Sequence, residues 1–251
     1  MSAQPHLDRP SGLRRVGHKG ADLITPGNTI ESFEAAVAAG VDTIEFDLLW
    51  TEDGDPRLPA AERAPLLIAH DWADAATRPH LTLDDALDAF THPPLDRVEI
   101  DLDLKLQGRE AEIAAAVREH GLIDRAMVST MEVPSLLRMG EAEPDLRRGW
   151  TYPRVTKDWR SRRWAAPGVI GGLAYMRRRL PIILARETER LGAFAVWVFH
   201  PLITPRLIKT ASAASIEVIA WTVDDLDRMR QLGALGVDGI CSNDPRLFAQ
   251  I

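Results

Sequence analysis

Short apolar segments alternate along most of this chain with alanine-rich segments of helical periodicity. This alternation is typical of parallel strands joined by crossover helices, because each helix returns the chain to the edge of the sheet where the next strand begins. Eight segments have the composition and length of strands: 14–18, 43–48, 98–104, 126–130, 147–151, 195–200, 217–222 and 238–242. They predict an α/β fold, a (β/α)8 TIM barrel, in which functional groups gather at the C-terminal strand ends.

Helices are expected between these strands, and small or polar residues mark several of their ends. Asn28 is the expected cap of the first helix, and Gly40 and Gly121 stand where helices stop and the chain turns into a strand. The expected helices are 29–39, 83–90, 110–120, 133–141, 205–214 and 224–232.

Two stretches depart from the alternation. Residues 51–70 contain the turn signal Glu52-Asp53-Gly54 and reach His70 without a helix, which predicts a hairpin inserted after strand 2. The connection after strand 5 is long and rich in arginine, and it contains Trp159 and Trp164. Such a connection is commonly a substrate loop, and the alternative is a solvated arginine-rich face.

The composition limits what kind of protein this is. A chain of 251 residues that is 45% hydrophobic can bury a large core, and we expect one domain, 1–251. A net charge of -7 argues against a nucleic-acid binder, which would normally be basic. The single cysteine, Cys241, excludes an internal disulfide. No segment is long and apolar enough to span a bilayer, and the N-terminus lacks the apolar run of a secretory signal, so we predict a soluble cytoplasmic protein.

Two of the predicted strands carry charged residues on one face only. Side-chain alternation places Glu45 and Asp47 opposite the apolar residues of the second strand, and Asp103 and Lys105 opposite those of the third. Carboxylates crowded on one side of a strand repel each other and lose hydration, so a cation should offset them. Hard carboxylate oxygens suit Mg²⁺ or Ca²⁺, and the absence of clustered Cys or His ligands disfavours zinc.

Other polar residues at strand ends have two readings each. His18 follows Gly17 at the end of the first strand, which favours proton transfer over a hydrogen-bonded core histidine. Trp221 either fills the barrel interior or forms an apolar wall at the C-terminal end of the barrel. For His200 we favour a structural role. The acids could also be interior residues paired with an arginine, such as Arg14 or Arg148. Two acids at one strand end favour a metal.

The order and spacing of these motifs resemble the glycerophosphodiester phosphodiesterase family over nearly the whole chain. Its barrel is similar to that of the phosphatidylinositol-specific phospholipases C. The matching segments are His18-Lys19-Gly20-Ala21, Pro26-Gly27-Asn28-Thr29, Glu45-Phe46-Asp47, Ile68-Ala69-His70-Asp71, Asp103-Leu104-Lys105, Ala220-Trp221-Thr222-Val223 and Gly236-Val237-Asp238-Gly239-Ile240.

The resemblance implies roles for individual residues. The divalent cation would be held by Glu45, Asp47 and Asp103. The acid and base would be His18 and His70, of which one deprotonates the nucleophile and the other protonates the departing alkoxide. The phosphate oxygens would be contacted by Lys19 and Lys105 as point charges. The expected reaction is hydrolysis of a small glycerophosphodiester to sn-glycerol 3-phosphate and an alcohol.

Three residues depart from the family pattern. Lys19 replaces an arginine, Gly27 replaces a glutamate, and Asp103 replaces a glutamate that is one methylene longer. The first two changes are linked in our interpretation, because the loss of the acid removes a partner for the arginine. All three bear on substrate preference more than on the class of reaction.

Two alternatives stay open. The Asp-x-Lys pattern at 103–105 also resembles the sphingomyelinase D-like branch, for which the substrate is a phospholipid and the product can be a cyclic phosphate. The arginines and tryptophans after strand 5 would then make a peripheral contact with phospholipid. A non-catalytic barrel that binds a phosphorylated ligand is the other alternative, and the intact His18 and His70 argue against it.

Overall fold

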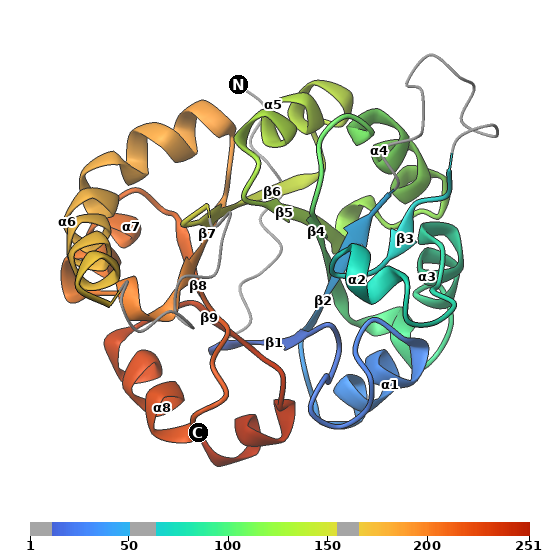
Figure 1. Cartoon of the computed structure of the whole chain (residues 1–251), viewed down its shortest axis with the longest axis horizontal. Helices are drawn as coiled ribbons and strands as arrows, with labels where there is room; N and C mark the ends of the chain where they lie inside the picture. Colours follow the sequence, from blue (N-terminus) through green and yellow to red (C-terminus); the bar gives the residue numbers. More distant parts are fainter. Residues whose placement is uncertain (1–11, 51–63, 155–165) are drawn as a thin grey trace.

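A computed structural model of the chain describes residues 12–50, 64–154 and 166–251, and its strands form a closed barrel (Figure 1). The sheet order is β1-β9-β8-β7-β6-β5-β4-β2-β3, and pairing of β1 with β2 closes the ring. The barrel strands are β1 Arg14–His18, β2 Thr43–Leu49, β4 Glu99–Leu104, β5 Ala126–Thr130, β6 Arg147–Tyr152, β7 Ala195–Phe199, β8 Glu217–Trp221 and β9 Gly239–Ser242. These eight strands are parallel, which confirms the predicted (β/α)8 barrel.

Helices surround this barrel (Figure 1). The α-helices are α1 Ile30–Ala38, α2 Trp72–Ala75, α3 Leu83–Ala89, α4 Glu110–Glu119, α5 Val133–Ala142, α6 Ala166–Leu191, α7 Pro205–Ala213 and α8 Leu226–Leu235. Short 3-10 helices occur at Leu95–Arg97, Ile123–Arg125, His200–Leu202 and Pro245–Gln250. No helix in the described part of the chain is both long and apolar enough to cross a membrane.

The predicted cap of the first helix is wrong. Thr29, in extended conformation, caps α1, because its hydroxyl accepts a hydrogen bond from the Ser32 N–H. Asn28 lies one residue earlier with a left-handed φ of 60°, and its side chain is used elsewhere.

The two irregular stretches have different outcomes. The short strand β3, Leu67–Ile68, pairs antiparallel with the end of β2, as a hairpin requires, and residues 51–63 lie outside the described part.

The arginine-rich stretch contains a helix that is not predicted from the sequence, α6, which is 26 residues long. Glycines and Pro181 obscured its helical pattern, because both residue types are poor helix formers. Trp159 and Trp164 lie outside the described residues.

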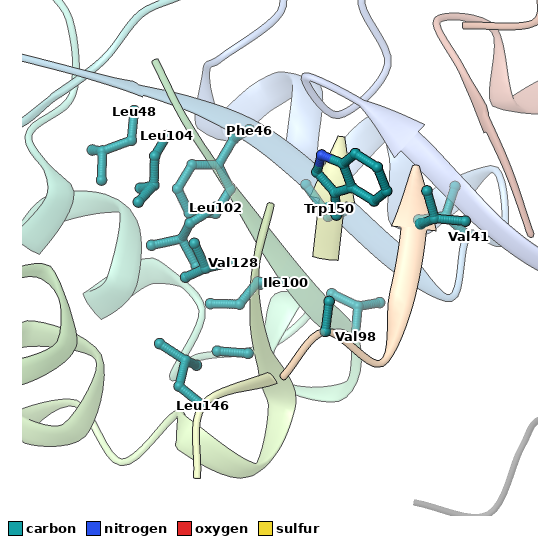
Figure 2. Close-up of a cluster of buried hydrophobic side chains, with 14 of the residues drawn as sticks. Val41, Phe46, Leu48, Val98, Ile100, Leu102, Leu104, Val128, Leu146 and Trp150 are labelled. Atoms are coloured by element: carbon teal, nitrogen blue, oxygen red, sulfur yellow. The ribbon is translucent and has the colours of Figure 1, made fainter. Parts of the chain in front are cut away.

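Two apolar cores lie on opposite faces of the barrel wall, because alternate residues of each strand point to opposite sides. Between the strands and the helices, Figure 2 shows Phe46, Leu102 and Val128, which come from three neighbouring strands. Inside the barrel, a smaller cluster includes Val16 and Trp197. The residues adjacent to Phe46 along β2 therefore point into the barrel.

Charged residues at the first positions of strands form an ion-pair layer at the N-terminal end of the barrel. Arg14 pairs with Glu99 and lies 3.7 Å from Glu217, and Arg147 lies 2.9 Å from Glu99. The Arg148 guanidinium instead donates to the Gly192 carbonyl. In the described structure these arginines are therefore engaged away from the acids of β2 that we assigned to a metal.

Candidate active site

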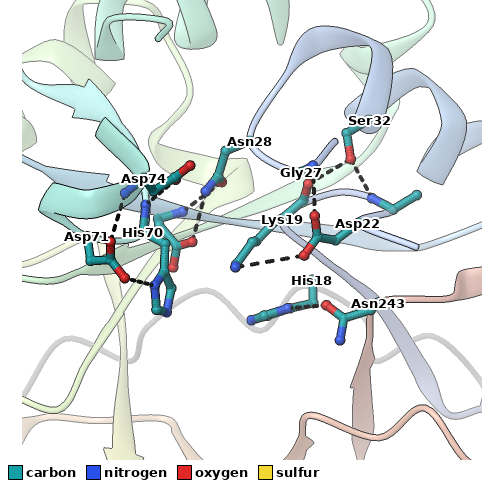
Figure 3. Close-up of polar contacts among 12 residues, drawn as sticks. His18, Lys19, Asp22, Gly27, Asn28, Ser32, His70, Asp71, Asp74 and Asn243 are labelled. Atoms are coloured by element: carbon teal, nitrogen blue, oxygen red, sulfur yellow. Dashed lines mark hydrogen bonds and ion pairs between the residues drawn. The ribbon is translucent and has the colours of Figure 1, made fainter. Parts of the chain in front are cut away.

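The polar residues at the ends of β1, β2 and β4 meet at the C-terminal end of the barrel. His18 ends β1 and pairs in register with Glu45 of β2, and Asp47 of β2 pairs with Asp103 of β4. Figure 3 shows the side chains of His18 and His70 in the same part of the molecule, and the charges of both act on Asp47. Strand register thus brings the predicted site residues together.

Three carboxylates form a cluster that can hold a metal ion. Ligand oxygens of Glu45, Asp47 and Asp103 lie within 4.8 Å of one another. Glu45 and Asp47 are buried. Burial raises the pKa of Glu45 well above its ordinary value, and the negative charge of Asp47 raises it further. Three closely spaced oxygen ligands in a buried site with excess negative charge fit a hard divalent cation.

Lys105 is the positive group that the chain itself places beside these carboxylates. Its Nζ lies 2.5 Å from Asp47 Oδ1 and donates a short hydrogen bond to Asp103. Burial acts to lower the pKa of Lys105, but Asp103 and Asp47 outweigh it and raise that pKa above its usual value. Burial acts to raise the pKa of Asp47, but the charge of Lys105 more than offsets it and lowers that pKa. Both groups are therefore charged at neutral pH.

His18 is held by residues after β8 and β9 to which we had assigned no role. Its Nδ1 lies 2.6 Å from Asn243 Oδ1, and Asn243 Nδ2 donates to Asp224 Oδ2 at 2.7 Å. A carboxylate only accepts hydrogen bonds, so Asp224 fixes the Asn243 amide with its oxygen toward the imidazole. His18 Nδ1 therefore carries the proton, and Nε2, 3.9 Å from Glu45 Oε2, makes no hydrogen bond to the described residues. Burial lowers the pKa of this imidazole.

His70 approaches the site from the segment after β3. Its Nδ1 lies 3.0 Å from Asp71 Oδ2, and its backbone N–H donates to Asp74 Oδ2 at 3.0 Å. Asp71 in turn caps α2 by accepting from the Asp74 N–H. The side chain of His70 is 47% exposed, and its charge contributes to lowering the pKa of Asp47. The two histidines therefore stand in different surroundings, one in the barrel wall and one on a half-exposed capping segment.

Asn28 is a further residue of the site that we had interpreted only as a helix cap. Its Nδ2 donates to Asp47 Oδ2 at 2.9 Å, and its Oδ1 accepts from the Asp47 N–H at 3.2 Å. The left-handed backbone that points the side chain toward β2 is one that asparagine adopts readily. These two bonds orient the Asp47 carboxylate. In the sequence, the only signal for such a role is the match of residues 26–29 to the Pro-x-Asn-Thr motif of the family.

Replacing Asn28 with alanine should weaken divalent-cation binding by about 10- to 100-fold, as is typical when a residue that orients a metal ligand is lost. Titration calorimetry with Mg²⁺ and with Ca²⁺ measures this affinity. The matched control is Thr29→Ala, which removes the helix cap from the same loop and should leave the affinity close to that of the unaltered protein. Equal losses in both variants would mean that loop stability, and not the bonds to Asp47, is responsible.

Trp221 and His200 lie at the C-terminal ends of the neighbouring strands β8 and β7. Trp221 ends β8, is half-buried, and its ring lies 5.5 Å from that of Phe199. Its Nε1 is buried and has no hydrogen-bond partner among the described residues. Arg228 donates to His200 at Nδ1, 3.2 Å away, and at the backbone carbonyl, 2.7 Å away. His200 is therefore engaged by an arginine, whereas Trp221 has an unused polar atom.

A TIM barrel with two imidazoles, a carboxylate cluster and a lysine at the C-terminal strand ends has groups that can transfer protons and hold a cation. The chain belongs to the glycerophosphoryl diester phosphodiesterase family, whose model matches residues 18–58 and 83–247. This match confirms the family inferred from the motifs, and it makes the protein a phosphoric diester hydrolase. Between residues 18 and 247 the family model leaves 59–82 unmatched, and this interval contains His70.

Relatives and solved structures agree with this assignment. A glycerophosphodiester phosphodiesterase of Arabidopsis thaliana is 46% identical over 57 residues, which are 23% of this chain and 17% of that protein. One of Caldanaerobacter subterraneus subsp. tengcongensis is 23% identical over 269 residues, covering 94% of this chain and 96% of that protein. A solved phosphodiesterase of Oleispira antarctica, in complex with the product sn-glycerol-3-phosphate, has a TM-score of 0.66 at 18% identity, covering 94% of this chain and 95% of that chain. This last likeness shows the fold.

Proposed function

We propose that this protein hydrolyses glycerophosphodiesters to sn-glycerol 3-phosphate and an alcohol, with His18 and His70 as its acid–base pair. The observation that carries the proposal is that the charges of both imidazoles act on Asp47, a member of the single carboxylate cluster found among the described residues. Figure 3 shows the two histidine side chains in the same part of the molecule. The Oleispira antarctica phosphodiesterase, which has the same fold, binds sn-glycerol-3-phosphate, and this supports the same product here.

The residues that would hold a divalent cation are Glu45, Asp47 and Asp103. When bound, the cation would neutralise charge on the phosphoryl oxygens. Lys105 already lies beside two of these carboxylates and would contact a phosphate oxygen as a point charge.

The surroundings of the two histidines suggest which one accepts and which one donates a proton. His18 Nε2 has no hydrogen-bond partner among the described residues, and burial lowers the pKa of the imidazole, so His18 would be neutral and able to deprotonate the nucleophile. His70 is half-exposed, and Asp71 fixes its ring by accepting a hydrogen bond from the Nδ1–H. The other ring nitrogen, Nε2, would therefore protonate the departing alkoxide. Protonation matters because an alkyl alkoxide is a very poor leaving group near neutral pH.

The substrate class can be tested by incubating the protein with glycerophosphocholine, lysophosphatidylcholine and bis-p-nitrophenyl phosphate, with and without Mg²⁺ or Ca²⁺. Phosphorus NMR should show sn-glycerol 3-phosphate from glycerophosphocholine. Turnover of lysophosphatidylcholine alone, or a lasting cyclic phosphate, would instead support the sphingomyelinase D-like alternative. Binding of these compounds without turnover would support a non-catalytic barrel.

Three sequence-based expectations stay predictions. They are the single-domain extent 1–251, the cytoplasmic location, and the peripheral contact with phospholipid. The last depended partly on Trp159 and Trp164, which lie outside the described residues.

A further inference from the structure

Lys19 is paired with a carboxylate of its own loop. Its Nζ lies 3.8 Å from Asp22 Oδ2, and Asp22 Oδ1 accepts a hydrogen bond from the Gly27 N–H at 2.8 Å. In Figure 3 the Lys19 amine points toward the region where the side chains of His18 and His70 lie. The charge of Lys19 acts on both His18 and Asp47, lowering the pKa of each, which places this ammonium group at the site itself.

The missing side chain at position 27 makes room for this carboxylate. A Cβ on Gly27 would lie 2.5 Å from Asp22 Oδ1 and 2.7 Å from the Cβ of Lys19, closer than van der Waals contact allows. Gly27 is not among the glycines with a positive φ, so it is needed here for space and not for backbone conformation. Two departures from the family pattern, Lys19 and Gly27, are thus connected through Asp22.

The loop that carries the pair is fixed by other bonds. The Lys19 carbonyl accepts from the Asn28 N–H at 3.0 Å, and Arg78 donates to the Gly27 carbonyl at 2.6 Å. An asparagine at position 22 could still accept from the Gly27 N–H through its amide oxygen. The charge of Asp22 can therefore be removed while the shape of the loop is kept.

We infer that Asp22 partly neutralises the charge of Lys19 and so lowers the affinity of the site for a phosphomonoester more than its affinity for a phosphodiester. The inference rests on the proposed function, because it takes Lys19 as a phosphate contact. Coulomb energy scales with the product of the charges. Partial neutralisation of the Lys19 charge therefore weakens its attraction for a dianion more than its attraction for a monoanion. The diester substrate carries one negative charge and the monoester product carries up to two. Asp22 is thus a specificity-determining residue that favours product release.

The test is Asp22→Asn, assayed at low ionic strength for inhibition by sn-glycerol 3-phosphate and for the KM of glycerophosphocholine. The inhibition constant should fall by about two- to fivefold, the range expected for a partly exposed ion pair, and KM should fall by less. The effect should shrink as salt is added, because mobile ions screen exposed charges. A thermal melt by circular dichroism checks that the variant folds as the unaltered protein does.

Two comparisons make this result specific. Asp227→Asn makes the same change in net charge at a residue of α8 whose side chain is 81% exposed and pairs with Arg230, and it should leave both constants unchanged. In a Lys19→Met background, Asp22→Asn should tighten binding of the product less than it does when Lys19 is present, because only the direct repulsion between the carboxylate and the phosphate is then removed. The inference is overturned by an unchanged inhibition constant in Asp22→Asn, by an equal shift in Asp227→Asn, or by a shift of undiminished size without Lys19.

Failure of the proposed function would be visible separately. If the unaltered protein turned over none of the diesters, calorimetric titration with sn-glycerol 3-phosphate would still measure the effect of Asp22→Asn on binding of a phosphomonoester. A shift seen there would support the charge balance and contradict only the reaction.

Discussion

Alanine in place of His18 or His70 should lower kcat by about 10²- to 10⁴-fold, the usual contribution of a positioned general acid or base. In the proposed mechanism, the two losses have different physical causes. Without His18, no neutral imidazole remains at the end of β1 to accept the proton of the nucleophile. Without His70, the departing alkoxide has no donor. Steady-state rates with glycerophosphocholine measure both effects.

Substrates with different leaving groups separate the two roles. A p-nitrophenolate group leaves without protonation. His70→Ala should therefore retain a much larger fraction of the unaltered protein's activity on bis-p-nitrophenyl phosphate than on glycerophosphocholine. His18→Ala should lose activity on both. The control is His92→Ala, because His92 is exposed and contacts Thr91 and the Asp88 carbonyl at the end of α3. Full activity of either site variant on glycerophosphocholine would contradict the acid–base assignment.

Removal of divalent cations should reduce turnover by at least about 10³-fold, since a bound cation contributes several kcal/mol to stabilising charge on a phosphoryl group. The loss should be reversed by adding Mg²⁺ or Ca²⁺ back, and comparison of the two identifies the preferred ion. Asp47→Asn should cause a comparable loss that added cation does not restore, because this fully buried residue is central to the cluster and pairs with Lys105.

Asp101→Asn is the matched control for the buried acid. Asp101 also faces the barrel interior, where it accepts a hydrogen bond from Ser129, but it is not part of the carboxylate cluster. Burial, followed by the charge of Glu45, raises the pKa of Asp101 well above its ordinary value, so an amide resembles its protonated form. This variant should keep most of its cation affinity. Undiminished turnover in excess chelator would remove the cation from the proposed mechanism.

Strand alternation is the reason that the convergence of the candidate site residues could be predicted from the sequence. Once Glu45 and Asp47 are placed opposite Phe46, and strand ends of a barrel are known to converge, their proximity to Asp103 follows without further information. The apolar face of β2 packs against the helices, which removes any choice about which way the acids point.

What could not be predicted depends on contacts between segments that are distant in sequence. Asn243 lies 225 positions from His18, and no local pattern shows that its amide would orient that imidazole. Asn28 was interpreted by its tendency to cap helices, whereas the adjacent Thr29 forms the cap and frees Asn28 to bind Asp47. The helix α6 was missed because its local propensity is poor and its burial against the barrel stabilises it, with Leu180 and Leu184 in the core.

The two histidines belong to parts of the chain that are built differently. His18 is built into the barrel wall, whereas His70 lies in the one interval between residues 18 and 247 that the family model leaves unmatched. Under the proposed mechanism, exchanging that interval with a relative would exchange the group that protonates the departing alkoxide and would leave the carboxylate cluster and Lys105 in place. The proposed acid could therefore be engineered independently of the residues proposed to hold the cation and the phosphate.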